Sequence, residues 1–142
     1  MIVVDANLLI YSYDTEAIDH AKSSAWVAKA FSGAEAVGLP WQTVTAFLRV
    51  VTNRRLPGKR VTLQEAIAAV EEWLEQPNVR ILVPGENHWP LLKRLIVEGA
   101  AAGPLITGAQ LAALAIENGG VLYTADQDFA RFPGLRWVNP LT

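Results

Sequence analysis

The sequence predicts an α/β fold in which a parallel sheet carries helices on both faces. Two observations support this class: the strand-like segments are short, apolar and mostly β-branched, and segments with helical periodicity lie between most of them. The 142 residues are 51% hydrophobic and 18% charged, which is enough to build a core and excludes disorder as the main description. We therefore expect a single domain over residues 1–142, with a mostly parallel sheet of about five strands.

The predicted strands are runs of three to five residues that are separated by turn signals or by helices. Because such short apolar runs suit strands that are covered on both faces, they indicate a buried parallel sheet. The five runs are Ile2–Val4, Ala36–Leu39, Val79–Val83, Val121–Thr124 and Leu135–Val138.

The clearest predicted helix begins at Thr62, where Thr62-x-x-Glu65 forms a capping box, and it ends before Pro77. Four apolar residues recur on one face of this helix, namely Leu63, Ile67, Val70 and Leu74. Gly119-Gly120 is a stop signal for the last long helix. The other predicted helices are Ala21–Phe31, Thr43–Thr52, Trp89–Val97 and Leu105–Glu117.

The charges exclude several classes of protein. Twelve Lys and Arg residues against fourteen acids give a net charge of −2, so the chain is not a wholly basic nucleic-acid binder. The absence of Cys excludes a disulfide framework, a thiolate zinc site and a Cys nucleophile. Two stretches, 36–48 and 99–116, carry no charge, but Gly103-Pro104 breaks the longer one. With no signal-peptide pattern at the start, we expect a cytoplasmic chain without a membrane segment.

Acidic residues follow two of the predicted strands. Asp5 comes directly after the first strand, and Asp126 and Asp128 come just after the fourth. Ligands of open parallel sheets bind at the carboxyl ends of strands, so the chemistry is expected there. Carboxylates without nearby His or Cys suit a hard cation such as Mg²⁺ or Mn²⁺. The alternative is structural: Asp5 would cap a helix opening at Ala6, and Asp128 would cap or anchor the turn before Phe129.

The opening from Met1 to Tyr11 resembles that of PIN-domain proteins, especially the VapC-type toxins of bacterial toxin–antitoxin pairs. Further similar blocks follow in the family's order: Leu39-Pro40-Trp41, Phe47–Thr52, Leu111–Ala115, Leu122–Phe129 and Phe132–Trp137. The resemblance implies an α/β/α sandwich and a Mg²⁺-dependent endoribonuclease that a cognate antitoxin blocks. It also implies a homodimer. By this resemblance, Asp5, Asp126 and Asp128 match catalytic positions of the family, and Asp5 and Asp126 are the expected metal ligands.

Two acids of the family pattern are missing from this chain. The resemblance implies a Glu before the apolar-Leu-Arg run, where Ala46 stands, and an Asp opening the Leu-Ala-Ala-Leu-Ala helix, where Gly108 stands. Removing two of about four carboxylates roughly halves the negative charge that holds the cation. We therefore expect an impaired or inactive ribonuclease. The alternative is a non-catalytic PIN module that binds RNA or a protein partner without cleavage.

Five cations fall within twelve residues that contain no acid, and they are Arg49, Arg54, Arg55, Lys59 and Arg60. One interpretation is a patch for the RNA backbone, carried mainly by the three arginines. The other is a solvated helix end whose cations favour the C-terminal dipole.

Three polar residues flank the acidic edge in the sequence: Asn7, Thr107 and Thr124. Side chains of these types could hold an acid, a water or a phosphate in place. Capping of the neighbouring backbone is the alternative role.

Overall fold

The computed structural model describes all residues, 1–142, and contains one five-stranded sheet in the order β3-β2-β1-β4-β5. All four strand pairings are parallel, so the predicted parallel α/β architecture is confirmed. The strands lie within one or two residues of their predicted bounds. They are β1 (Ile2–Val4), β2 (Val37–Pro40), β3 (Val79–Leu82), β4 (Val121–Tyr123) and β5 (Trp137–Val138).

β1 is the central strand and its three residues are buried. Val3 pairs with Gly38 on β2 and with Leu122 on β4, so the neighbouring strands run in register with it. Because the sheet is parallel, the residues that follow these strands emerge at one edge. Asp5 is the first residue beyond β1 and therefore lies at the middle of that edge.

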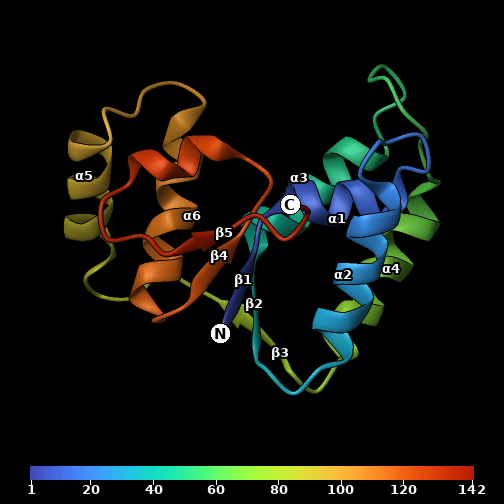
Figure 1. The fold of residues 1–142 in the computed structure, drawn as a ribbon, viewed down its shortest axis with the longest axis horizontal. Helices are drawn as coiled ribbons and strands as arrows, with labels where there is room; N and C mark the ends of the chain where they lie inside the picture. Colours follow the sequence, from blue (N-terminus) through green and yellow to red (C-terminus); the bar gives the residue numbers. More distant parts are fainter.

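Helices cover both faces of the sheet, as Figure 1 shows. One face carries the first four helices, and the other carries the last two together with a short 3₁₀ helix, η1. None of the helices has the length and apolarity that a membrane span requires. The bounds are α1 (Ala6–Tyr13), α2 (His20–Ser32), α3 (Trp41–Val51), α4 (Leu63–Glu75), α5 (His88–Glu98), α6 (Leu105–Glu117) and η1 (Gln127–Arg131).

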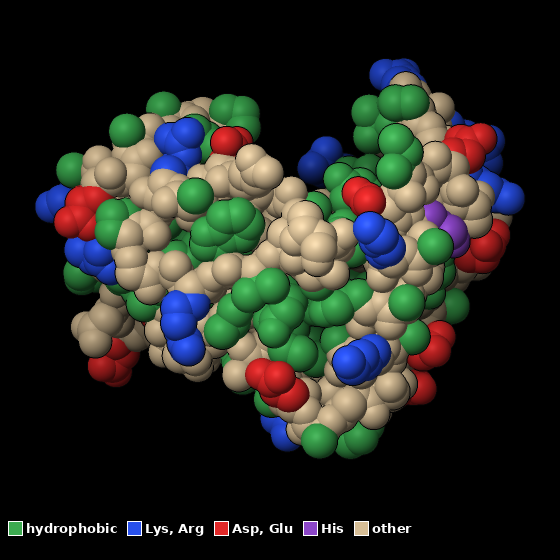
Figure 2. Space-filling model, in the orientation of Figure 1, with side chains coloured by type: hydrophobic (Ala, Val, Ile, Leu, Met, Phe, Trp, Pro, Cys, Tyr) green, Lys and Arg blue, Asp and Glu red, His purple; other side chains and the backbone are tan.

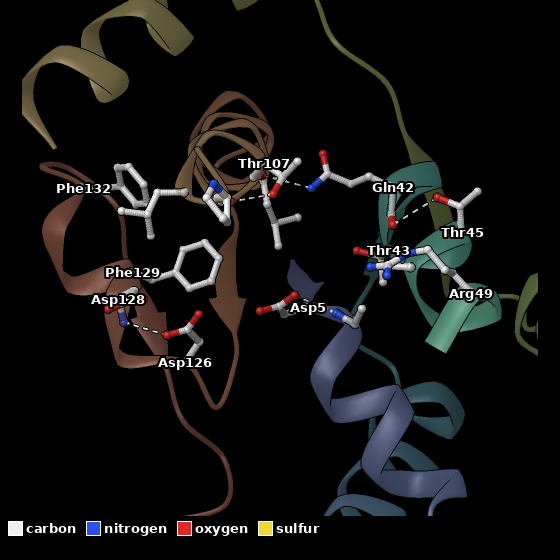
Figure 3. A pocket seen from close by; sticks show the side chains of 16 residues that line it. Asp5, Gln42, Thr43, Thr45, Arg49, Thr107, Asp126, Asp128, Phe129 and Phe132 are labelled. Carbon is white, nitrogen blue, oxygen red and sulfur yellow. Dashed lines mark hydrogen bonds between the residues drawn. The ribbon is translucent and has the colours of Figure 1, made fainter. Parts of the chain in front are cut away.

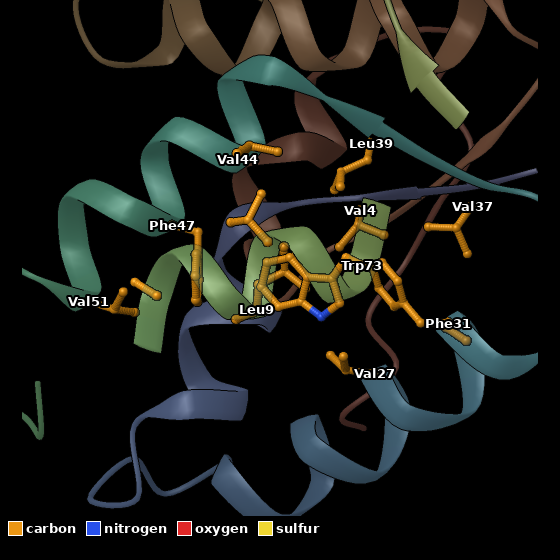
Figure 4. Packing of buried hydrophobic residues seen from close by; sticks show 14 of the residues in the cluster. Val4, Leu9, Val27, Phe31, Val37, Leu39, Val44, Phe47, Val51 and Trp73 are labelled. Atoms are coloured by element: carbon orange, nitrogen blue, oxygen red, sulfur yellow. The ribbon is translucent and has the colours of Figure 1, made fainter. Parts of the chain in front are cut away.

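Two separate hydrophobic clusters hold these layers on the sheet. On the side of α1 to α4, the Trp73 ring packs against Phe31 and Phe47 at centroid distances of 5.7 and 4.8 Å (Figure 4). On the other side, Leu95 and Leu122 are fully buried in a cluster that also takes in α6 and η1. The sheet therefore separates two packed layers, and the edge at which β1 ends lies between them.

The apolar periodicity of α4 does not mark its buried face. Leu63, Ile67 and Leu74 are 56%, 42% and 38% exposed, and of the four predicted residues only Val70 is buried. The face that meets the core is rotated around the helix and consists of Ala66, Ala69, Val70 and Trp73. Small Ala side chains let the helix approach closely while one large indole fills the remaining space. An apolar repeat thus predicted the helix but not the face that it buries.

Candidate functional site

A cavity of about 410 Å³ lies at the edge where β1, β2 and β4 end. Its walls come from the starts of α1, α3 and α6 and from η1, so both helical layers contribute. In the space-filling view the molecule is hollowed between its two sides (Figure 2). Figure 3 shows Asp5 in the middle, Asp126 on the η1 side and Arg49 on the α3 side. The predicted edge of the sheet is therefore a real depression that the predicted acids line.

The Asp5 carboxylate caps a helix and faces the cavity at the same time. Its Oδ1 accepts a hydrogen bond of 2.7 Å from the backbone N–H of Ala6, which caps α1. Its Oδ2 accepts from the Thr124 hydroxyl at 2.7 Å and from the Asn7 amide at 3.3 Å. The structural and the functional interpretation of Asp5 are therefore compatible, because one oxygen serves the helix and the other joins the site network.

Thr124 connects the two strand ends that carry the acids. Its side chain is fully buried, and its hydroxyl donates to Asp5 while accepting from the Asn7 amide at 3.2 Å and from the Asp126 backbone N–H at 3.0 Å. A hydroxyl has one hydrogen and two lone pairs, so Thr124 uses its full capacity here. Asn7 also accepts a hydrogen bond of 3.4 Å from the Ala125 backbone. Two of the three polar residues that flank the acids thus hold Asp5 in place.

Asp126 and Asp128 both line the cavity but have different surroundings. The Asp126 carboxylate caps η1 by accepting a hydrogen bond of 2.8 Å from the Asp128 backbone N–H. The structural alternative named Asp128 as the residue that caps or anchors this turn, but the residue that caps it is Asp126, two positions earlier. The Asp128 side chain is exposed and has no hydrogen-bond partner within the chain. One carboxylate oxygen of Asp126 is engaged in the cap, and the other remains available.

Burial raises the pKa of Asp5 above its ordinary value. Hydrogen bonds from Thr124 and from the Ala6 backbone oppose this shift, whereas the negative charge of Asp126 adds to it. Of these four influences on the pKa, the charge of Asp126 is the smallest. A cation between them would relieve both the burial cost and the repulsion.

The two positions that lack an acid also face this cavity. Ala46 lies on α3 and Gly108 lies on α6, on opposite walls. A Cβ added at Gly108 would meet the Phe129 ring at 3.7 Å, which is ordinary van der Waals contact. A Cβ at Gly108 would therefore fit without displacing its neighbours. Nowhere in the chain do three Asp, Glu, His or Cys side chains come together to hold a metal ion.

The predicted basic residues divide into two places. Arg49 lies on α3 and lines the cavity, whereas Arg54 and Arg55 lie on the exposed loop between α3 and α4 and do not. Thr107 lines the cavity, but its hydroxyl donates to the Pro104 carbonyl at 2.9 Å and so closes the first turn of α6. Only one of the three arginines therefore belongs to the site that the acids define.

Sequence reasoning missed two polar residues at the start of α3. The Thr43 hydroxyl is buried and donates to the Val4 carbonyl at 2.9 Å, which joins α3 to the end of β1. The Gln42 amide donates to the Thr107 carbonyl at 3.2 Å and so bridges α3 and α6 across the cavity. Their position after the strand-ending Leu39-Pro40 is the signal that could have singled them out.

Comparison with known proteins identifies the family of the chain. The profile of the PIN domain matches residues 2–135. Ribonuclease VapC33 of Mycobacterium tuberculosis is 38% identical over 141 residues, which is 99% of each chain. Ribonuclease VapC37 of the same organism is 36% identical over 140 residues, covering 99% of this chain and 97% of the relative.

Solved structures share the fold. VapBC-1 from nontypeable Haemophilus influenzae superposes with a TM-score of 0.69 at 20% identity, covering 100% of both chains. VapC20 of Mycobacterium tuberculosis, described as a toxin that cleaves the sarcin–ricin loop, has a TM-score of 0.68 at 19% identity over 96% of this chain and 99% of that one. The match to the PIN-domain family covers residues 2–135, and the chain belongs to that family. Its full-length relatives place it among the VapC ribonucleases.

Proposed function

We propose that this chain is a toxin-type endoribonuclease of a toxin–antitoxin pair whose metal-dependent cleavage of RNA is strongly weakened. One observation carries the proposal: the three remaining aspartates and the two positions without an acid line the same cavity. The fold and the binding edge of a ribonuclease are thus present, while two of the expected carboxylates are absent. The full-length similarity to VapC ribonucleases supports RNA as the substrate.

Asp5 and Asp126 are the residues that would hold a divalent cation. Their carboxylate oxygens are hard donors, and Mg²⁺ is often held by one or two carboxylates with waters completing its shell. A bound Mg²⁺ or Mn²⁺ would supply the Lewis acid that activates a water and stabilises the charge on a phosphodiester. Thr124 and Asn7 keep Asp5 oriented toward this position. Asp128, which is exposed at the rim, would complete the catalytic set.

Arg49 is the residue best placed to attract an RNA backbone, because it is the arginine that lines the cavity. Its guanidinium would give a phosphate one positively charged hydrogen-bond donor beside the carboxylates. Arg54 and Arg55 would extend the contact only for an RNA that reaches beyond the cavity. We expect a cognate antitoxin to cover this cavity. We also expect the chain to act in the cytoplasm.

The decisive experiment restores the missing carboxylates. We expect the double variant Ala46→Glu with Gly108→Asp to cleave single-stranded RNA in the presence of Mg²⁺ at least about a hundredfold faster than the parent chain. Cleavage by the variant should stop on addition of EDTA and on the further change Asp5→Ala. RNA-cleavage rates measured over a series of Mg²⁺ concentrations test this expectation.

The matched control is Ala46→Gln with Gly108→Asn, which adds side chains of the same size without charge. If this control cleaves as fast as the restored variant, the carboxylates are not the cause. Efficient cleavage by the parent chain that is abolished by Asp5→Ala would show that the site is already complete. If the restored variant binds RNA and the metal without cleaving, the chain is a non-catalytic PIN module that binds RNA.

A further inference from the structure

The loop between α3 and α4 is closed by its own hydrogen bonds. We call residues 53–60 the basic loop. Its two ends meet where the Val61 backbone N–H donates to the Val51 carbonyl at 3.1 Å. The Arg60 guanidinium donates to three carbonyls inside the loop, namely those of Asn53, Pro57 and Lys59. A surface loop whose ends are close and whose own side chains fill it is compact rather than extended.

Asp14, the residue that follows α1, fastens the basic loop to the rest of the chain. Its Oδ1 accepts a hydrogen bond of 2.9 Å from the Lys59 backbone N–H and one of 3.0 Å from the Glu16 backbone N–H. No Lys or Arg side chain pairs with this carboxylate, so it serves the backbone alone. In Figure 1 the connection between α1 and α2 accordingly runs beside the loop between α3 and α4.

Gly58 allows the Asp14 carboxylate to come this close. The φ angle of Gly58 is +99°, in the left-handed region that glycine adopts without strain. A Cβ at this position would collide with Asp14 Oδ2 and would come within 3.1 Å of Arg60 Nη1. The turn of the basic loop is therefore shaped around the Asp14 carboxylate.

The basic loop presents three exposed cations, Arg54, Arg55 and Lys59, and none of them forms an ion pair within the chain. Arg49 stands five positions before Arg54, in the last turn of α3, and lines the cavity. In Figure 2 the part of the molecule that carries the loop projects beside the hollow, with Lys or Arg side chains at its tip. The cations therefore continue outward from the wall of the cavity.

We propose that Asp14 is a positioning residue for RNA, which holds the basic loop so that Arg54, Arg55 and Lys59 meet the phosphates of a single strand that leaves the cavity past Arg49. This inference rests on the proposed function, in which RNA is the substrate. A loop that is ordered before binding loses less conformational entropy than a mobile one, so its cations bind phosphates more tightly. Asp14 thus promotes the binding of a polyanion although it is itself negative.

The sign of one substitution separates this role from simple electrostatics. The probe is a fluorescently labelled single-stranded RNA, whose binding to the full chain in EDTA is followed by anisotropy over a salt series. Asp14→Ala removes a negative charge, which alone would tighten binding. We expect it instead to raise the Kd at least about fivefold, and to flatten the slope of log K against log salt by up to about two, as three phosphate contacts weaken. Asp14→Asn keeps an accepting oxygen and should bind at least as tightly as the parent.

Two further variants act as partner and control. Gly58→Ala keeps every charge and should weaken RNA binding as Asp14→Ala does, because its Cβ collides with the Asp14 carboxylate. Glu16→Gln removes an exposed acid close to the latch that forms no ion pair, and it should not raise the Kd. Circular dichroism checks that each variant is folded. Amide hydrogen exchange in residues 53–60 should rise in Asp14→Ala and Gly58→Ala but not in Glu16→Gln.

Four results would overturn the proposal. RNA binding that Asp14→Ala leaves unchanged or tightens, or an equal loss in Asp14→Asn, would refute the role of Asp14 and leave the proposed function intact. A parent chain that binds no RNA would refute it too, and cleavage by the variant Ala46→Glu with Gly108→Asp then decides whether the proposed function survives. A polyglutamate probe that binds as tightly as the RNA would assign the basic loop to an acidic protein.

Discussion

Asp5 shows how one residue can serve folding and chemistry together. One carboxylate oxygen caps α1, and the other is held by Thr124 and Asn7 beside the cavity. Burial raises the pKa of this carboxyl, and the Asp126 charge raises it further. The negative charge is therefore kept at a cost in stability, as is common where a site is arranged for a ligand rather than for the fold alone.

The pH dependence of stability follows from this shift. Because the pKa of Asp5 is higher in the folded than in the unfolded chain, the folded state binds more protons between the two values. The contribution of Asp5 to the stability of the fold is therefore greatest below the pKa that Asp5 has in the unfolded chain. It falls as the pH rises through the pKa that Asp5 has in the folded chain. We expect Asp5→Asn to remove this fall and to raise the free energy of unfolding at neutral pH by about 1 kcal/mol.

Urea unfolding over a series of pH values measures both effects. Asp128→Asn is the matched control, since Asp128 lines the same cavity with an exposed side chain. A neutral-pH stability for Asp5→Asn that lies below that of the parent would mean that the cap and the bond to Thr124 outweigh the burial of the charge.

At the scale of elements, local signals predicted most of the helices and strands. α6 has the bounds that its apolar run and the following glycines predict, and the capping box at the start of α4 is formed. α1 was predicted only through the cap that Asp5 offers, since eight residues with apolar groups on several sides give no clear periodicity. The strand ends shifted by one or two residues because they are set by pairing with neighbours rather than by the strand's own sequence.

The capping box allows a quantitative prediction for α4. The Thr62 hydroxyl accepts a hydrogen bond of 3.1 Å from the Glu65 backbone N–H, and the Glu65 carboxylate accepts from the Thr62 backbone at 3.4 Å. We expect Thr62→Ala to lower the free energy of unfolding by about 1 kcal/mol, because an N-terminal donor of the helix loses its partner. Urea unfolding measures the loss, and Gln64→Ala, a change at the exposed second residue of the same helix, should have almost no effect. Equal losses in the two variants would contradict the role of the cap.

At the scale of the whole molecule, the sheet divides the core into two clusters, and Trp73 unites the helices of one of them. Its ring contacts Tyr13 on α1, Phe31 on α2 and Phe47 on α3. We expect Trp73→Ala to lower the free energy of unfolding by about 3–5 kcal/mol, because it leaves a large cavity among four helices.

Chemical denaturation of Trp73→Ala can be compared directly with Trp89→Ala, since the Trp89 side chain is 63% exposed on α5. The second variant should lose less than about 1 kcal/mol. Similar losses for both would mean that α5 carries more of the stability than its exposed face indicates.

Local patterns in the sequence predict the parallel α/β class, the order of most elements and the strand ends at which the acids lie. These follow from local patterns, because an apolar run, a cap or a stop signal acts on residues close in the chain. The contact of Asp5 with Thr124, 119 residues away, is visible only in the folded chain. The same holds for the cavity that Ala46 and Gly108 share and for the place of Arg54 and Arg55 outside it. The tertiary structure also decides which face of α4 is buried. Each of these depends on how separate elements pack, and the packing of distant side chains is not encoded in any one segment.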